Sequence, residues 1–137
     1  MKEMILEPYS VRLNFKMDSP MTAAQWGRML SDLIETLARN CSEAGPCVIG
    51  HLKGFARISE NYFLRISAIS ADRPADVEAR FSDDISKLSL SLNVLVYGHP
   101  KEMLAQLTRQ TIDLSEKPWS NHVTMESSEH GHIQRMR

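Results

Sequence analysis

Six side chains near the middle of the sequence have the types and the spacing to bind an anionic ligand. Most of them stand at alternate positions, as side chains on one face of a strand do. They are His51, Lys53, Phe55, Arg57, Phe63 and Arg65. Arginine presents a planar fork of donors to phosphate, lysine presents a point charge, and aromatic rings stack on unpaired bases. We therefore take these six residues as a candidate site for an anionic small ligand or single-stranded RNA.

The alternation of arginine and phenylalanine also has a structural explanation, which we prefer. Cation–π pairs across a sheet stabilise it by about 0.5–1 kcal/mol each where they are exposed. The face that carries them would then be covered by the last helix or by a second copy of the protein. Residues 53–56 (KGFA) also begin like the RNP1 run of RNA-binding domains, but Arg57-Ile58 departs from it. This short match leaves an RNA- or nucleotide-binding module as the alternative hypothesis.

His51 suggests a third hypothesis, a small enzyme. Beside Lys53 it could bind phosphate or shuttle a proton, as a His/Lys acid–base site would. A partly exposed strand residue is the simpler explanation of this histidine. The motifs of hydrolases, NTPases, dehydrogenases and metalloproteases are missing from the sequence, which counts modestly against an enzyme. We therefore expect a non-catalytic accessory or ligand-binding protein.

The cysteines and the remaining histidines offer no strong metal site. Cys41 and Cys47 are further apart than the usual metal-binding pair, and Cys41 falls in an apolar helical stripe. We expect both to be reduced, buried thiols. His130 and His132 are only a weak metal candidate, because nothing in the sequence fixes their geometry. We predict no metal and no cofactor.

Composition limits the class of partner. The 137 residues suit one domain, and with 42% hydrophobic residues the chain can form a core without a disulfide or a metal. The formal net charge of −1 creates no general attraction to nucleic acid or membranes, so an anionic ligand must meet a local patch. The sequence lacks an apolar stretch of the roughly 18 residues that a membrane span needs, and it lacks a typical secretory signal. We expect a cytoplasmic protein without a membrane partner.

The candidate site needs a sheet to position it, and four segments alternate apolar and polar residues as strands do. They are residues 9–17, 48–58, 62–70 and 88–97. A three-residue hairpin loop at 59–61 would join the middle two segments. The residues opposed across this hairpin would be Arg57 with Phe63, Phe55 with Arg65, and Lys53 with Ser67.

Two helices are predicted with clear signals. The first begins at a capping box formed by Thr22 and Gln25, and its apolar stripe continues to Cys41. The second covers residues 100–112. Residues 72–87 are ambiguous: their apolar residues recur at gaps of four, which indicates a short helix, and a loop within an open mixed sheet is the alternative.

The predicted order of elements is that of an α+β, ferredoxin-like βαββαβ sandwich with an extra C-terminal helix and a flexible C-terminal tail. The expected division is a single α+β domain at residues 1–113 and a polar, partly disordered tail at 114–137. Both main helices would cover one face of the sheet and leave the other bare. Aromatic and apolar residues on the bare face, such as Phe55, Phe63 and Tyr97, predict a homo-oligomer.

Overall fold

The computed structural model describes residues 5–119 and 121–127. Six strands and two helices lie within these residues. In chain order they are β1 (Tyr9–Met21), α1 (Ala23–Glu43), β2 (Val48–Arg57), β3 (Phe63–Ala68), β4 (Asp76–Arg80), β5 (Ile85–Tyr97), α2 (Lys101–Trp119) and β6 (Asn121–Ser127). The chain is therefore α+β.

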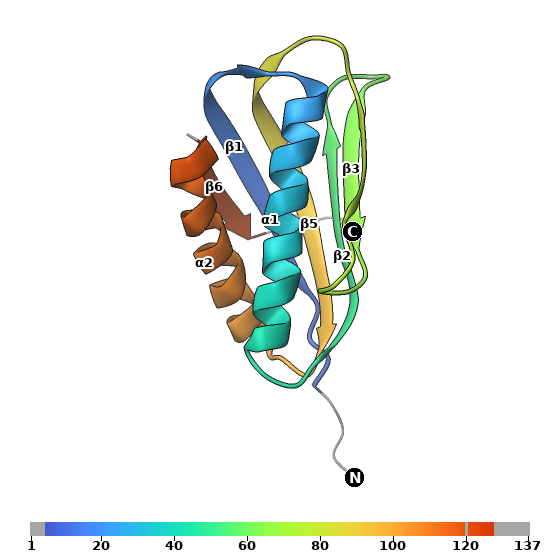
Figure 1. The fold of residues 1–137 in the computed structure, drawn as a ribbon, viewed down its shortest axis with the longest axis vertical. Helices are drawn as coiled ribbons and strands as arrows, with labels where there is room; N and C mark the ends of the chain where they lie inside the picture. Colours follow the sequence, from blue (N-terminus) through green and yellow to red (C-terminus); the bar gives the residue numbers. More distant parts are fainter. Residues whose placement is uncertain (1–4, 120, 128–137) are drawn as a thin grey trace, which may run out of the picture.

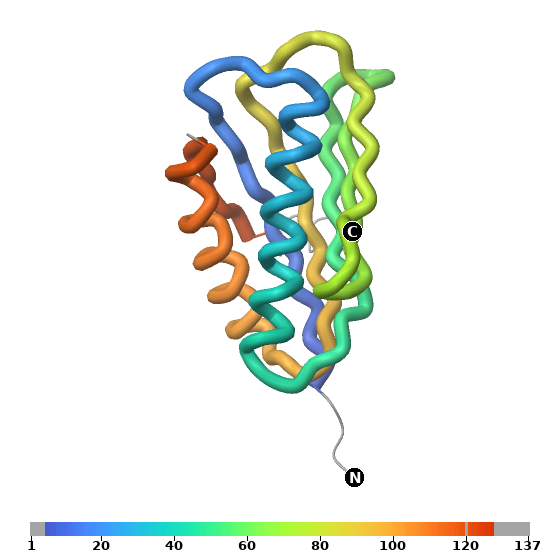
Figure 2. Tube along the Cα trace, viewed as in Figure 1, coloured from blue at the N-terminus to red at the C-terminus, as the bar shows by residue number. Residues whose placement is uncertain are grey.

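All six strands form one antiparallel sheet, in the order β4-β3-β2-β5-β1-β6. Both helices lie on the same face of this sheet, with α1 over its middle and α2 over the side formed by β1 and β6 (Figure 1). The Cα trace shows the strands and helices running along the long axis of the molecule (Figure 2). Neither helix in the described part of the chain is long and apolar enough to cross a membrane. We call the sheet face opposite the helices the open face, since none of the described elements covers it.

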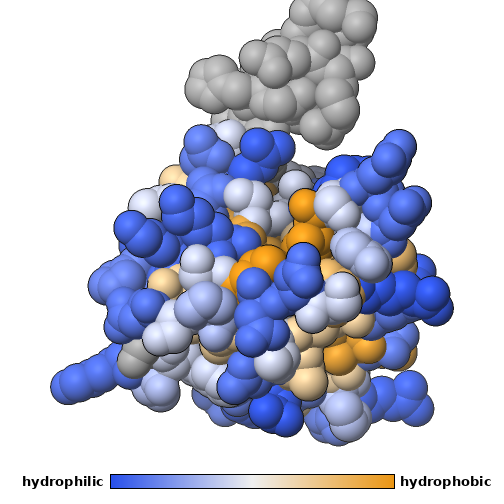
Figure 3. Space-filling view, turned by 90° about the horizontal axis from the view of Figure 1, so that it is seen from above, coloured by the Kyte–Doolittle hydropathy of each residue, from blue (hydrophilic) through white to orange (hydrophobic). Residues whose placement is uncertain are grey.

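The core lies between the helices and the inner face of the sheet. Phe15 and Trp26 meet edge to face with their ring centroids 6.0 Å apart, and Trp26 Nε1 donates to the Ile85 carbonyl oxygen at 2.9 Å. The predicted capping box of α1 is confirmed. Thr22 Oγ1 accepts from the Gln25 backbone N–H at 3.1 Å, and Gln25 Oε1 accepts from the Thr22 backbone N–H at 2.8 Å. Seen end-on, hydrophobic side chains gather near the middle of the described surface, with hydrophilic ones around them (Figure 3).

The prediction of a ferredoxin-like βαββαβ fold is wrong. Where that fold needs a second crossover helix, residues 76–80 form strand β4, which pairs with β3 at the edge of the sheet. The alternative of a loop in a mixed sheet is also wrong, because every strand pair is antiparallel. The apolar residues spaced four apart belong to three different parts of the structure: β4, the loop after it, and β5. Their match to the helical period is therefore a coincidence.

Helix α2 is longer than its apolar pattern predicts. The expected end near Ile112 is wrong, because the helix continues to Trp119. Thr108 and Ser115 are buried on its inner face, and their hydroxyls donate to carbonyl oxygens one turn back, at 2.8 Å to Leu104 and 2.7 Å to Ile112. Polar side chains that satisfy their own hydrogen bonds therefore extend the buried face beyond the apolar stripe.

Residues 121–127, which the sequence places in a polar tail, form strand β6 along the outer side of β1. Val123 and Met125 oppose buried residues of β1 and are half-buried themselves. The rest of the predicted tail, residues 128–137, lies outside the described residues.

Candidate functional site on the open face of the sheet

One row of side chains crosses the open face in register through all six strands. Starting at β4, it contains Glu78, Arg65, Phe55, Ser91, Arg12 and Glu126. Adjacent strands lie about 4.8 Å apart, so the row spans roughly 24 Å. The row combines charges of both signs with an aromatic ring, and these are groups that contact a polar ligand rather than form a core.

Two aromatic rings form a platform on this face. The predicted register of the β2–β3 hairpin is confirmed for all three pairs, and it places Phe55 and Phe63 diagonally across the hairpin. The two rings stack with their centroids 6.1 Å apart and an interplanar angle of 20°. Phe55 is 43% exposed, so the platform is accessible to a ligand.

A cavity of about 500 Å³ lies beside Phe55. Strands β2, β3, β4 and β5 all contribute to its wall. The cavity is lined by Lys53, Gly54, Phe55, Arg65, Ile66, Ser67, Asp76, Glu78, Ser91 and Asn93. Three of the six predicted site residues, Lys53, Phe55 and Arg65, therefore meet in one cavity. Its volume falls in the range of roughly 300–1,000 Å³ that is typical of small-ligand sites.

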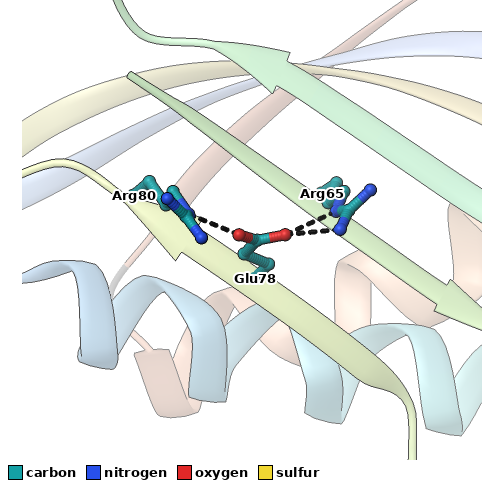
Figure 4. A network of polar contacts seen from close by, with 3 residues as sticks. All are labelled: Arg65, Glu78 and Arg80. Atoms are coloured by element: carbon teal, nitrogen blue, oxygen red, sulfur yellow. Dashed lines mark hydrogen bonds and ion pairs between the residues drawn. The ribbon is translucent and has the colours of Figure 1, made fainter. Parts of the chain in front are cut away.

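Glu78 changes the charge that the predicted site presents. Its Oε1 accepts from Arg65 Nε at 2.8 Å and lies 2.5 Å from Arg65 Nη2, and its Oε2 contacts Arg80 (Figure 4). The hydrogen bond from Arg80, together with the contact to Arg65, lowers the pKa of the Glu78 carboxyl below its ordinary value. Glu78 therefore stays ionised at neutral pH. The Arg65 guanidinium is already engaged and is a weaker anion ligand than the sequence suggests.

Lys53 and Arg57 supply positive charge on the open face of β2. Neither residue forms an ion pair within the described residues. Arg57 Nη1 makes only a long contact, 3.4 Å, to the Glu60 carbonyl oxygen. The two residues stand on either side of Phe55 along β2, each two positions away. The exposed ring therefore has an available cation on both sides.

His51 lies outside the cavity. It opposes Leu95 on β5, directly after a β-bulge at Gly50. Burial, and then the neighbouring charge of Lys53, lowers the pKa of the imidazole. The ring is therefore mostly neutral at pH 7 and adds little positive charge. His51 therefore neighbours Lys53 along β2 but does not line the cavity with Lys53, Phe55 and Arg65.

The acidic part of the site is not predicted by the sequence. Asp76 and Glu78 come from β4, and the prediction of a helix there placed no carboxylate on the open face. A signal is present, since residues 76–80 (DVEAR) alternate polar and apolar side chains as a short strand does. Five residues are too few for this alternation to outweigh the longer helical spacing.

Both cysteines are free thiols: Cys41 is buried in the last turn of α1, whereas Cys47, just before β2, is only half-buried and not buried as expected. Cys47 Sγ and His99 Nε2 contact the same atom, the Cys41 carbonyl oxygen, at 3.5 and 2.8 Å. Burial raises the pKa of the Cys41 thiol to about 12, so it is protonated at neutral pH. No cluster of three metal-ligating side chains occurs among residues 5–119 and 121–127. The weak metal candidates His130 and His132 lie outside the described residues.

The fold and the site together define a class: a two-layer α+β domain whose open antiparallel sheet carries an aromatic platform beside a polar cavity. Comparison of the chain with models of known families, with curated proteins and with solved structures finds no match.

Proposed function

We propose that this chain is a non-catalytic binding protein that holds a nucleotide, free or within a strand, on its open face. The observation that carries the proposal is the exposed stack of Phe55 on Phe63, with an available cation on either side of it. A base would lie on the platform, and its phosphate would meet Lys53 or Arg57. Only binding groups are involved, and no residue needs to act on the ligand chemically.

The aromatic platform supplies affinity for a base of any type. Stacking of a base on an aromatic side chain contributes roughly 1–3 kcal/mol, and every base has a flat π face. Phe55 leaves 43% of its surface exposed on a face that is otherwise mostly polar. A base that covers this ring gains hydrophobic energy in addition to the stacking energy.

The cavity wall offers partners for the rest of a nucleotide. Lys53 can meet phosphate oxygens, and Asp76 can accept hydrogen bonds from hydroxyl or amino groups. Asn93 can donate and accept through its amide. Arg65 contributes less, because Glu78 already occupies its donors.

Self-association through the open face is the second candidate. Phe55, Leu95 and Tyr97 are partly exposed there, and such side chains favour cover by a second copy. The other side chains of this face are mostly charged groups, hydroxyls and amides, which a dry interface would have to desolvate. We therefore rank ligand binding above self-association. The homo-oligomeric state and the cytoplasmic location stay predictions.

Calorimetric titration with the four nucleoside 5′-monophosphates tests the proposal. We expect weak, salt-sensitive binding by the wild-type chain. Phe55→Leu should lose roughly tenfold or more in affinity, because leucine keeps the apolar bulk but cannot stack on a base. Tyr62→Leu is the matched control, since Tyr62 is equally exposed at 43% but lies in the β2–β3 loop, away from the cavity wall.

Two results would contradict the proposed function. A wild-type chain that binds neither the monophosphates at millimolar concentration nor a short oligonucleotide has no nucleotide site. An equal loss of affinity in Phe55→Leu and Tyr62→Leu would mean that the platform is not the site. Light scattering on the same samples tests the second candidate, because a monomer at micromolar concentration rules out self-association.

A further inference from the structure

We infer that the ligand is a single strand of nucleic acid several nucleotides long, and that Lys16 and Lys87 form a second phosphate site for it on the open face. This inference rests on the proposed function, because a base at Phe55 would anchor the strand. It adds the length of the ligand and its path over the sheet.

The lysine pair is an arrangement that sheets normally avoid. Lys16 on β1 and Lys87 on β5 are opposed in register on the open face, and like charges directly opposite each other destabilise a sheet. Neither lysine forms an ion pair in the part of the chain that the structure describes. On its other side Lys16 opposes His122 of β6, whose Nε2 lies 3.3 Å from the Asp18 carboxylate. A phosphate between the two lysines would replace their repulsion with two attractions.

The charges of the open face form a basic band with acidic borders. The inner four strands carry the exposed basic residues of the band, Arg12, Lys16, Lys53, Arg57, Arg65 and Lys87. The edge strands carry most of the carboxylates, namely Asp76, Glu78 and Glu126, together with one arginine, Arg80, which contacts Glu78. Asp18, beyond Lys16 at the end of β1, is the exception. The chain as a whole has a formal net charge of −1, so this concentration of positive charge is local and matches a polyanion.

The lysine pair is too far from Phe55 for a single nucleotide that stacks on this ring to reach both. Phe55 and Arg12 lie in one row across the sheet, and Lys16 is four positions further along β1. At about 3.3 Å per residue, the lysines are roughly 13 Å along the strand direction from Phe55, and roughly half that from the row of Arg57 and Phe63. The surface between them is polar, since Ser89 Oγ donates to Asn14 Oδ1 at 2.6 Å. A strand of several nucleotides could therefore follow the band and contact both sites.

Fluorescence anisotropy with labelled oligonucleotides of two to twelve bases tests this inference on the full-length chain. We expect affinity to rise with length until the band is covered and to fall as salt rises. A duplex should bind more weakly, because its paired bases cannot stack on Phe55. Oligo-uridylate and oligo-deoxythymidylate are both titrated, and length-dependent binding of either one supports the inference.

The double variant Lys16→Gln/Lys87→Gln separates the second site from the first. It should weaken binding of the 12-mer roughly tenfold or more. It should also make the plot of log affinity against log salt concentration less steep, by about 1.4 in slope, or 0.7 for each lost phosphate contact. Binding of nucleoside monophosphates should not change, and the variant should melt no lower than the wild type. The control Arg28→Gln/Arg39→Gln removes the same charge from exposed positions of α1, on the other side of the sheet, and should have a much smaller effect.

The outcomes distinguish this inference from the proposed function. If monophosphates bind but the 12-mer binds no tighter, or if the lysine variant behaves like the arginine control, the second site is refuted and the proposed function stands. If neither monophosphates nor oligonucleotides bind, both are refuted. Equal affinity for a duplex would overturn the assignment of a single strand.

Discussion

Glu78 is the residue that most limits the positive charge available on the open face. One carboxylate holds two arginines, Arg65 from the neighbouring strand and Arg80 from its own strand (Figure 4). The same contacts lower its pKa, so the carboxylate stays charged through the physiological pH range. The stability that it contributes is present above the ordinary carboxyl pKa and is lost only as pH falls through the lowered value.

Replacing Glu78 by glutamine should therefore tighten binding of a single strand at pH 7 by several fold. The change releases both arginines for phosphate contacts and removes a repelling charge. Anisotropy titration with a 12-mer measures the effect. Glu43→Gln, at the end of α1 on the other side of the sheet, removes the same charge without touching the site. A similar gain in affinity in both variants would show that the effect comes from net charge alone.

Cys41 should make the fold less stable at alkaline pH. Burial raises the pKa of its thiol to about 12 in the folded chain, and the pKa of an unfolded cysteine is about 8.5. Between these values the unfolded chain releases a proton that the folded chain retains, so stability falls as pH rises. Thermal melts at pH 7 and pH 10 measure this loss, which should be smaller in Cys41→Ala. Equal losses in Cys41→Ala and the wild type would mean that other groups cause the alkaline effect.

At the scale of elements, the sequence predicts the long or strongly periodic parts of the fold and fails at the edges. The start of α1 and the β2–β3 register follow from a capping box and a hairpin loop, which are local signals. Strands β4 and β6 are short edge strands with few buried apolar residues, so their alternation is weak. Their pairing with β3 and β1 depends on contacts that are distant in sequence.

The same contrast between well-predicted and poorly predicted elements applies to the candidate site. Its aromatic and basic residues are predicted because they lie on the well-marked hairpin. Its carboxylates are not predicted, because Asp76 and Glu78 reach the face only through β4. The pairing of Lys87 with Lys16 is not predicted either, since it depends on the register between β1 and β5.

Removing β6 should lower the melting temperature, although the sequence analysis places these residues in a polar, partly disordered tail. A chain that ends at Trp119 loses seven residues of pairing with β1 and leaves that strand as a bare edge. A chain that ends at Ser127 keeps every described strand pair and is the control. Thermal melts followed by circular dichroism compare the two. If both truncated chains have the same melting temperature as the full-length protein, β6 contributes nothing to stability.

At the scale of the whole molecule, the two faces of one sheet have different roles: the inner face stabilises the fold, and the open face carries the proposed binding site. The inner face packs on both helices (Figure 1). It carries the buried apolar residues that stabilise the fold. The open face carries the aromatic platform and the basic band. Because side chains alternate between these faces along every strand, adjacent residues have unrelated roles. Stability and binding can therefore be changed separately by substitutions one position apart.

Leu92 and Ser91 on the central strand β5 test this separation with the same substitution. Leu92 is 1% exposed and opposes Val11 and Gly54, while Ser91 is exposed between Phe55 and Arg12. Leu92→Asp should unfold the chain, because an unpaired buried carboxylate costs several kcal/mol against a total stability of about 5–15 kcal/mol.

Ser91→Asp should instead keep the fold and weaken oligonucleotide binding, because it places a negative charge in the middle of the basic band. Circular dichroism melts measure the first effect and anisotropy titration measures the second. Raising the salt concentration should restore part of the relative affinity of Ser91→Asp, since the added repulsion is screened. A folded Leu92→Asp chain with wild-type melting would mean that the inner face is assigned wrongly. A Ser91→Asp chain that binds as tightly as the wild type would mean that the strand does not cross the sheet there.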